Sequence, residues 1–535
     1  MTKKTLKTTT VLVIVSLSMI LLLSYQHDIG NATLPETFET VITPTNIQEF
    51  VSSGTGEQFF PFVLSLEDRS TLIKDIFASL IIDGLSFTTG TTALAVVNCS
   101  HVKILNTEFS NQGINLKVRD TTEVFLLQNV FNGPRNVVLI NCSLLTIDLC
   151  HFTNYHTAIS ITNTQELFLT HTTGTNSVET FLAGIMIKNV SISNITVRTG
   201  TALDLLYITD LKVQDSQINA MVVQHSNLTV FNSTLDTLKV FESNIDLGSN
   251  IITCLQAVDN SVTTIQTNQI EFFAIDNITQ LTLSNNILSN RISFLTRNLQ
   301  YLQDAEITNN TIETGLPIIF LKDQSNSILN TPNGQLILVN LSSSIIDGLR
   351  FNHQYFESRD LIIFRAVDLI FRNSSFSSGM ELLKSTNTTI HDCTFTQSTI
   401  GLYSTAINST VFRNNFTTCE TALVLEYASG DYYYNNFLAP VIDNGVVNNF
   451  TSNFYGIGVS APYLLPGSAS NRDLSPLPLP YLEHPPAVVN TTLPTTSVSG
   501  NISNTDNTLL YYLVFASLAF SGTLGALFMV RGIFK

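Results

Sequence analysis

The sequence predicts an all-β protein whose central residues, from about 60 to 455, form a parallel β-helix. Three observations predict it: an eight-residue block recurs about every 21 residues, a second short apolar run lies between many blocks, and helical periodicity is hard to find. Block positions 1, 3 and 8 are mostly apolar, and positions 5 to 7 carry Asn, Asp or Ser. The blocks are VKILNTEF (102–109), VFLLQNVF (124–131), LTIDLCHF (145–152), LKVQDSQI (211–218), LTLSNNIL (281–288), AEITNNTI (305–312), LIFRNSSF (369–376), TTIHDCTF (388–395), STVFRNNF (409–416) and GDYYYNNF (430–437).

Each block is interpreted as part of one coil of short strands, because alternate side chains of a strand point inward. One coil cannot close a core, so coils stack and bury a continuous apolar column. Asn at the corners tolerates left-handed backbone and can bond from coil to coil. A leucine-rich repeat is the alternative, because ITQLTLSNNIL (278–288) fits its phrase. The Asn of other blocks drifts among positions 5, 6 and 7, however, which favours the β-helix.

The stretch IIDGLSF (81–87) returns almost unchanged as IIDGLRF (345–351). The first copy stands at the entrance of a run of coils, and the second stands where periodicity resumes after a weaker region at about 313–344. We therefore predict two stacked arrays, at 61–330 and 331–460, with about 16–18 coils in all. A restart within one irregular solenoid is the alternative.

Both ends of the chain are apolar. Three lysines precede VLVIVSLSMILLL (11–23), which predicts a signal peptide or an uncleaved signal anchor. A charge-free run at 509–530 is long enough to span a bilayer, and the basic residues after it predict a cytoplasmic tail and an extracellular body. The predicted segments are the signal or anchor (1–30), an N-terminal cap region (31–60), a Pro-, Ser- and Thr-rich stalk (461–508), a transmembrane helix (509–530) and a tail (531–535).

The composition limits the partners. Only 12% of the residues are charged, against about 25% in ordinary soluble domains, so Asn, Thr and Ser must keep the surface hydrated. The net charge of −16 disfavours nucleic acid. Six cysteines without CxxC spacing are too sparse for a disulfide framework. Seventeen N-x-[ST] sequons mark candidate N-glycosylation sites, among them Asn98, Asn141, Asn194, Asn277, Asn373, Asn415 and Asn501.

The body closes on NNFTSNFYGIGVSAPYLLPGSASNRDLSPL (448–477). With the coil phrase, this segment resembles the right-handed parallel β-helix proteins of the NosD-like and pectin-lyase-like group, especially surface proteins of archaeal type. Val459 stands where that group usually has Asp, and the acidic run before it is missing, so an oxygen-ligand cation site is not expected there. The matching residues are Gly456, Ile457, Gly458, Pro462, Tyr463, Pro466, Gly467, Ser468, Ala469, Asn471, Asp473, Pro476 and Leu477.

The resemblance implies polysaccharide lyases and hydrolases among the relatives, so acidic groupings are the first candidates for catalysis. A hydrolase needs two carboxylates about 5–10 Å apart. The best grouping occupies no shared block position and is interpreted as solvated loop carboxylates. No convergent catalytic motif is found, which favours a protein that is not an enzyme without deciding it. The grouping consists of Asp148, Asp204, Asp210 and Asp215.

The NosD-like resemblance also implies copper processing, so histidines and cysteines are the next candidates. Cys150, His151, His156 and His171 form the only such cluster. Neighbouring residues of a strand point to opposite faces, and the chain has no His-x₃-His or Met-rich run. We predict no metal site and no cofactor.

One column of residues on the second array predicts a binding surface. Block position 4 faces solvent because positions 1 and 3 face the core. Consecutive coils should stack its residues, and an aromatic pair beside cationic donors suits a polysaccharide. The alternative is a capping loop near 440–455 that covers the rings. The predicted strip comprises Arg372, His391, Phe412 and Tyr433, flanked by Asp392, Arg413 and Tyr434; the first array has Leu105, Leu127, Asp148, Gln214 and Phe231 at position 4.

Together these features predict a membrane-anchored cell-surface glycoprotein, located at the cell membrane with an extracellular ectodomain. That ectodomain would serve in carbohydrate binding, adhesion or envelope structure. Its expected partners are the membrane, through the C-terminal helix, and polysaccharide or envelope glycans. A membrane-tethered polysaccharide lyase or glycoside hydrolase is the alternative, and a NosD-like copper-processing accessory protein is a more remote one.

Overall fold

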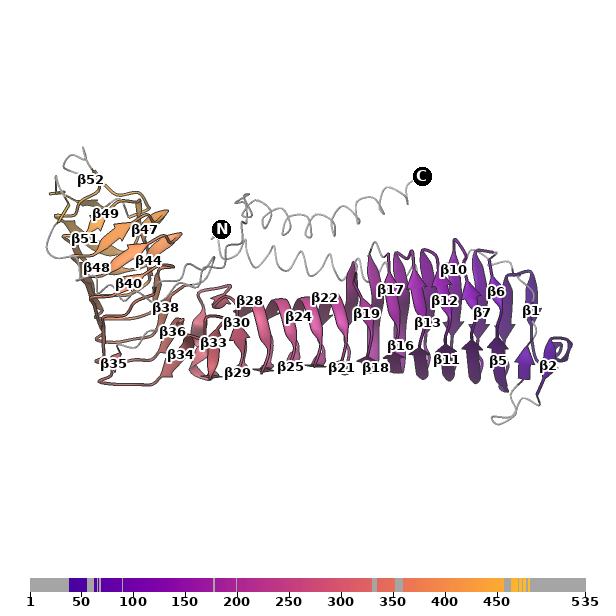
Figure 1. Cartoon of the computed structure of the whole chain (residues 1–535). Helices are drawn as coiled ribbons and strands as arrows, with labels where there is room; N and C mark the ends of the chain where they lie inside the picture. The colour runs from indigo at the N-terminus through magenta and orange to yellow at the C-terminus, as the bar shows by residue number, and fades with distance from the viewer. Residues whose placement is uncertain are drawn as a thin grey trace. The chain divides into compact units, whose positions relative to one another are not determined.

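The structure is a computed structural model (Figure 1). It describes residues 38–54, 62–64, 66, 69–88, 90–176, 179–198, 200–329, 334–351, 359–456, 463–469, 471–473, 475–477 and 480–481, all within one compact unit that spans 38–487. The predicted signal segment, most of the stalk, the segment at 509–530 and the tail lie outside these residues. Within the part of the chain that the structure describes, no helix combines the length and the apolar character needed to cross a membrane.

The described residues form a parallel β-solenoid of about 18 turns, which confirms the predicted all-β fold class. Each strand pairs in parallel with the strand one coil later. Leu94, for example, lies opposite Leu116, which lies opposite Val137. The right-handedness that the resemblance implies stays a prediction.

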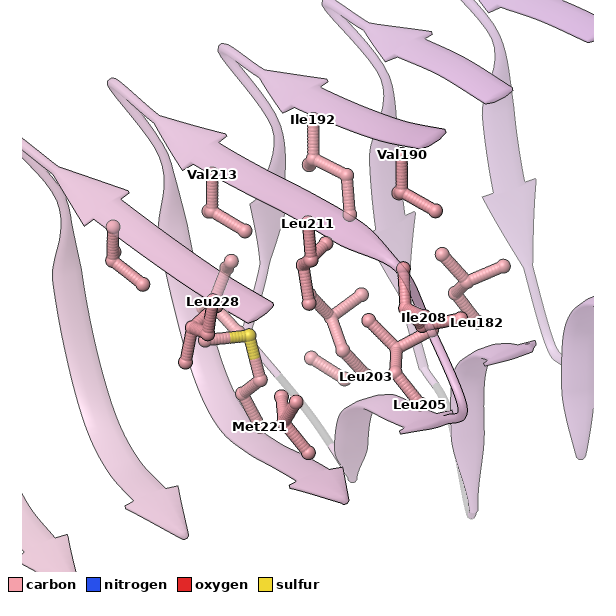
Figure 2. Close-up of a cluster of buried hydrophobic side chains, with 14 of the residues drawn as sticks. Leu182, Val190, Ile192, Leu203, Leu205, Ile208, Leu211, Val213, Met221 and Leu228 are labelled. Carbon is pink, nitrogen blue, oxygen red and sulfur yellow. The ribbon is translucent and has the colours of Figure 1, made fainter. Parts of the chain in front are cut away.

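Three columns of strands build the first array, and their inward residues, such as Leu182, Leu203 and Leu211, fill its interior (Figure 2). The first column holds β4 (Thr71–Lys74), β7 (Thr92–Val97), β10 (Ile114–Arg119), β13 (Arg135–Ile140), β16 (Thr157–Thr170), β18 (Thr180–Ser193), β20 (Thr201–Leu206), β22 (Gln217–Gln224), β24 (Thr234–Phe241), β26 (Ile251–Val258), β28 (Gln269–Asp276) and β31 (Ile292–Phe294). The second column holds β5 (Ser79–Asp83), β8 (His101–Leu105), β11 (Glu123–Leu127), β14 (Leu144–Asp148), the second halves of β16 and β18, β21 (Asp210–Gln214), β23 (Asn227–Phe231), β25 (Asn244–Gly248), β27 (Val262–Gln266), β29 (Gln280–Ser284) and β32 (Glu306–Thr308).

The third column is short at first and then merges with the first column of the next coil. From β22 to β28 one eight-residue strand serves both columns without a loop, and the coil shortens to 17 or 18 residues, against 21 to 23 earlier in the array. The separate strands of this column are β6 (Ser86–Phe87), β9 (Glu108–Phe109), β12 (Val130–Asn132), β15 (His151–Thr153), β17 (Thr173–Thr175), β19 (Thr196–Val197), β30 (Ile287–Leu288) and β33 (Asn310–Ile312).

A small cap precedes the first coil. Ile42 and Ile47 of this cap are buried against the array. Its elements are β1 (Thr40–Ile42), which pairs in parallel with β4, the 3-10 helix η1 (Ile47–Glu49), and the antiparallel pair β2 (Val51–Ser53) and β3 (Phe62–Leu64).

Two neighbouring corner positions explain why Asn drifts within the blocks. The residue at position 5 has left-handed backbone, as at Gln128 and Asn285 with φ of 54° and 55°. The residue at position 6 is buried and bonds from coil to coil: Asn286 accepts from the Asn268 backbone N–H at 2.9 Å and donates to Asn310 at 2.8 Å. Asn suits the first position because it tolerates this backbone, and the second because its amide donates and accepts.

Each copy of the repeated phrase starts a stack of buried aromatic rings. Phe87 ends IIDGLSF and begins the first stack, and Phe351 ends IIDGLRF and begins the second. Ring centroids are 4.8–5.2 Å apart in the first stack and 4.5–5.6 Å apart in the second. The first stack is Phe87, Phe109, Phe131 and Phe152; the second is Phe351, Phe376, Phe395, Phe416, Phe437 and Tyr455.

The second array follows an antiparallel turn, because β33 pairs in the antiparallel sense with β34. Its inner column is β34 (Pro317–Lys322), β36 (Gln335–Val339), β38 (Leu361–Phe364), β41 (Met380–Leu383), β44 (Ile400–Ser404), β47 (Thr421–Glu426) and β50 (Val441–Asn444). Its outer column is β35 (Ile328–Leu329), β37 (Ile345–Asp347), β39 (Ile370–Arg372), β42 (Thr389–His391), β45 (Ser409–Phe412), β48 (Ser429–Tyr433), β51 (Val447–Thr451), β53 (Arg472–Asp473) and β52 (Tyr463–Leu464), and its third column is β40 (Ser375–Phe376), β43 (Thr394–Thr396), β46 (Asn415–Thr417) and β49 (Asn436–Phe437).

From β36 to β47, the inner column of the second array is buried on both faces. In β36, Leu336 and Leu338 belong to the second array's own core, whereas Ile337 and Val339 belong to the core of the first array. The segment of the first array that holds β31 and the 3-10 helix η2 (Leu299–Gln303) contacts this column. One hydrogen-bonded sheet therefore continues through both arrays, although the chain has two hydrophobic cores.

Candidate functional site

The strip residues Arg372, His391, Phe412 and Tyr433 lie directly opposite one another on four consecutive coils. Each closes its strand on the outer column, and each is partly exposed. The flanking Asp392, Arg413 and Tyr434 follow at the corner, all with left-handed backbone. The structure therefore brings together all seven residues of the predicted strip.

The rings of the strip are stacked on one another. The His391 and Phe412 centroids are 4.9 Å apart with 10° between the planes, and the Phe412 and Tyr433 centroids are 5.1 Å apart with 8°. Phe412 therefore has a ring on each face, and a ligand would meet ring edges and polar tips instead of open ring faces. Because residues 441–444 and 447–451 are the strands β50 and β51 of the next coil, the capping loop considered near 440–455 is wrong.

The charged side chains of the strip form ion pairs with neighbouring side chains of opposite charge. Arg372 donates to Asp347 at 2.8 and 3.0 Å, and Arg413 donates to Asp392 at 2.6 Å. The His391 imidazole lies 2.7 Å from the same Asp392 carboxylate. Partial burial acts to raise the pKa of Asp347, but hydrogen bonds from Asn373 and Arg372 outweigh it and hold that pKa below its usual value. The strip is close to electrically neutral.

A second aromatic pair borders the strip. Tyr434 meets Tyr433 edge to face at 5.7 Å and stacks on Tyr481 at 5.3 Å. The backbone N–H of Tyr481 donates to Asn436 at 2.8 Å, and Asn436 donates back to the Tyr481 carbonyl at 3.2 Å. The sequence predicted Tyr434 here but not Tyr481, because no repeat pattern reaches the residues after the last coil.

The acidic grouping of the first array does not converge. Asp148 ends β14 and accepts from Thr170 and His171, at 2.8 and 3.0 Å. Asp204 lies in the first column, within β20, and Asp210 begins β21 in the second column. Asp215 follows β21 at a left-handed corner and accepts from Asn232 at 2.5 Å.

The His/Cys cluster is also dispersed. Cys150 is buried, and burial raises the pKa of its thiol to about 12, whereas His151 faces outward, 2.5 Å from the Thr173 hydroxyl. His171 pairs with Asp148 at 3.0 Å, and His156 lies 3.8 Å from Glu179. Within the described ranges, no group of three or more potential ligands could hold a metal ion.

The closing segment that carries the NosD-like resemblance caps the last coil. Asp443 is buried and accepts from Asn448 at 2.8 Å and from Asn471 at 2.6 Å, while Asp473 accepts from the Asn453 backbone N–H at 2.9 Å. Gly467 has φ of 130°, and a Cβ there would lie 2.0 Å from the Asp443 carbonyl oxygen. Protein donors already occupy both carboxylates, which gives these residues a structural role.

The seven named glycosylation candidates fall into three groups. Five of them are exposed corner residues with left-handed backbone, one lies half-buried within β46, and one lies outside the described residues. The half-buried residue in β46 is Asn415, and the residue outside the described part of the chain is Asn501. The five exposed corner residues are Asn98, Asn141, Asn194, Asn277 and Asn373.

The sequence reasoning missed a shallow polar groove of about 280 Å³ along the short coils. His225 and Glu242 line it, 3.2 Å apart, with Asn227 and Asn244 beside them. Tyr207 stacks on the His225 ring at 4.7 Å. No motif marks the groove, because its residues come from consecutive coils and are 17 or 18 positions apart.

No family model and no curated protein matches this chain. Among solved structures, the chain is similar to a PL6-family alginate lyase, AlyGC, with 9% identity and a TM-score of 0.22, covering 78% of this chain and 88% of that one. A mutant of the same lyase aligns with 10% identity and a TM-score of 0.16 over the same shares. The strand pairing itself defines the class of protein, a parallel β-solenoid; the finer NosD-like resemblance stays a prediction.

Proposed function

We propose that the chain is a membrane-anchored cell-surface β-solenoid whose second array binds an extended, neutral polysaccharide along the strip. One observation carries the proposal. The rings of His391, Phe412 and Tyr433 form a continuous stack at an outward-facing position, where a solenoid needs no aromatic residue for its core. The equivalent column of the first array has isolated rings only, such as Phe231.

The charge pattern supports a neutral ligand. Arg372 and Arg413 already donate to Asp347 and Asp392, so their guanidinium groups have little attraction left for a sugar carboxylate. A neutral glycan would place C–H groups on the ring edges and hydroxyls on the phenol and guanidinium tips. The repeat of similar groups on every coil, about 4.8 Å apart, suits an extended chain better than a single sugar.

The test is binding of the full chain, with Phe412 and Tyr433 both changed to Ala, to a soluble neutral glucan or mannan in titration calorimetry. Removing both ring edges should raise the Kd on the order of tenfold or more, because central aromatic residues dominate binding at such surfaces. Both residues face outward, so the variant should keep its fold and its melting temperature within a few degrees.

The matched control is Phe231→Ala. Phe231 occupies the same block position in the first array and is 54% exposed. We expect this variant to bind like the unchanged chain. Undiminished affinity of the double variant, or an equal loss in the control, would remove the strip as the binding surface.

The same glucan or mannan sample distinguishes the enzymatic alternative. A tethered hydrolase would release new reducing ends from this sample over hours, whereas a lyase, which needs the acidic C–H beside a sugar carboxyl group, would do so only from a uronic-acid polysaccharide assayed in parallel; a binding protein would release none from either. Release that survives the double variant would move the search for function to another surface, such as the groove at His225 and Glu242.

The anchoring part of the proposal rests on the charge-free run at 509–530 and the basic tail after it. Protease added to intact cells should remove the solenoid and leave a short C-terminal fragment in the membrane. A solenoid that stays protected until the cells are lysed would contradict this topology.

A further inference from the structure

Sequon asparagines recur at one kind of corner. Among the described residues, 41 non-glycine residues have left-handed backbone, and 16 of them are Asn. Ser or Thr stands two positions later after 10 of these 16, but after only 9 of the remaining 25. Sequons are therefore common at these corners, where the strand that follows often begins with Ser or Thr.

Most of these asparagines are held by a carboxylate. Asn141 donates from Nδ2 to Asp120 on the preceding coil at 3.0 Å, and its Oδ1 accepts from Asn163 on the following coil at 2.9 Å. We call a corner sequon whose Asn donates to such an Asp a clasped sequon. The clasped sequons are those of Asn98, Asn141, Asn232, Asn277, Asn340, Asn373 and Asn387, with Nδ2 to Oδ1 distances of 2.5–3.0 Å.

In a clasped sequon, one of the two hydrogens on the Asn side-chain amide does not bond to the Asp. A primary amide has two N–H groups, and the Asp takes one of them. Six of the seven asparagines are exposed, and Asn340 is half-exposed, so these side chains are accessible from solvent. A substituent on Nδ2 replaces one hydrogen and leaves the other for the bond to the Asp.

We propose that the clasped sequons carry N-linked glycans, so that sugars line the corners of the solenoid. The transfer forms a bond from Nδ2 to the anomeric carbon of a sugar and breaks the bond from that carbon to the phosphate of a lipid-linked donor. The amide proton leaves to a base of the transferase. This proposal shares only Asp347 with the strip, where that carboxylate accepts from both Arg372 and Asn373, and its readout differs from that of polysaccharide binding.

Other sequons serve as internal contrasts. Asn415 lies within β46, where it is half-buried between Thr394 and Asn436 of the neighbouring strands. Asn415 is a strand residue and not a left-handed corner residue, so the proposal predicts that Asn415 is bare. Asn106 has the clasp, donating to Asp83 at 2.8 Å, but Glu108 stands where a sequon needs Ser or Thr.

The test is glycopeptide mass spectrometry of the full chain, produced with its own N-terminal segment in a host that transfers lipid-linked sugars to asparagine. We expect sugar on the peptides that contain Asn98, Asn141, Asn277 and Asn387, and none on the peptide that contains Asn415. Bare clasped sequons, or equal occupancy of Asn415, would overturn the proposal. This mapping needs no variant and so does not depend on a variant folding.

Two substitutions sharpen the test. Glu108→Thr creates a sequon at a clasp that already exists, and the exposed position of Glu108 predicts that the fold tolerates it. Sugar should then appear at Asn106. Ser143→Ala removes the motif of Asn141 and keeps its clasp, so sugar should disappear there, while the melting temperature should match that of the unchanged chain when both are made in a host without N-glycosylation. A bare Asn106 in the first variant would also overturn the proposal.

Discussion

The two arrays use the same coil but expose it differently. In the first array, strands such as β24 alternate buried inner residues with exposed or half-exposed outer ones. In the second array, β36, β38 and β41 are buried at every position, because their outward side chains pack into the core of the first array. A parallel strand that is covered on both faces has a continuous apolar run, and the sequences LILV and LIIF show it.

This difference shows where a ligand can reach the second array. Its inner column is closed by the first array, so the outer column, which ends at the strip, and the third column are the open sheet faces among the described strands. The first array has no such restriction, and its outward residues follow no common chemistry. The aromatic stack at His391, Phe412 and Tyr433 therefore concentrates on the face that packing leaves free.

The largest predicted effect lies where the two arrays meet. Arg291 and Asp360 form an ion pair of 2.6 Å, with side chains that are 1% and 0% exposed. Burial raises the pKa of Asp360 to about 6, although the positive charge of Arg291 acts to lower it. Unfolding should therefore be measured at a pH about two units above this pKa, where Asp360 is ionised. There, Asp360→Ala leaves a buried guanidinium without its carboxylate, and we expect a loss of about 3–5 kcal/mol in denaturant unfolding.

The control for this change is Asp431→Ala. Asp431 is exposed in β48 and accepts an amide N–H from Asn449 at 3.1 Å, so its removal should cost less than about 1 kcal/mol. If Asp360→Ala costs no more than the control, the two arrays do not depend on the buried pair. Two separate unfolding transitions in the Asp360 variant alone would show that the pair couples the arrays.

The next effect compares the same device in both arrays. Asn435 accepts from the Asn414 backbone N–H at 3.0 Å, and Asn268 accepts from the Asn250 backbone N–H at 2.8 Å. Changing either to Ala leaves a buried N–H without a partner, so each should cost about 1–3 kcal/mol. Hydrogen exchange should locate the loss in the array that was changed; equal loosening of both arrays would show that they unfold as one unit.

The register of the strip was predictable because a block alignment counts residues, and a solenoid converts equal counts into equal positions. Arg372 and Phe412 are two coils apart in the blocks, and the strands pair as counted. The corner residues also followed, since Asn is favoured by left-handed backbone and by coil-to-coil bonding for separate reasons.

Contacts between distant coils could not be predicted from the sequence. Nothing in LIIF distinguishes a strand with one buried face from a strand with two, so the packing of Ile362 and Phe364 against the first array was not predicted. The orientation of the strip's aromatic rings also could not be predicted from the sequence. An aromatic residue at an outward position can present its face or its edge, and only stacking between Phe412 and Tyr433 decides between them.

The smallest predicted effect tests whether the repeated phrase does the same work in both arrays. Gly84 and Gly348 have φ of 66° and 71°, and a Cβ on either would meet no atom within 4 Å. Changing either to Ala should therefore cost only the backbone term, about 1 kcal/mol, and equally in both arrays. Asn should cost less than Ala, because Asn tolerates left-handed backbone and occupies the same corner one coil later, at Asn106 and Asn373. The measurement is the denaturant midpoint of the four variants. A Gly348→Asn variant that is no more stable than Gly348→Ala would mean that the phrase is kept for contacts of its own. A cost confined to one array would mean that the two copies begin their aromatic stacks by different means.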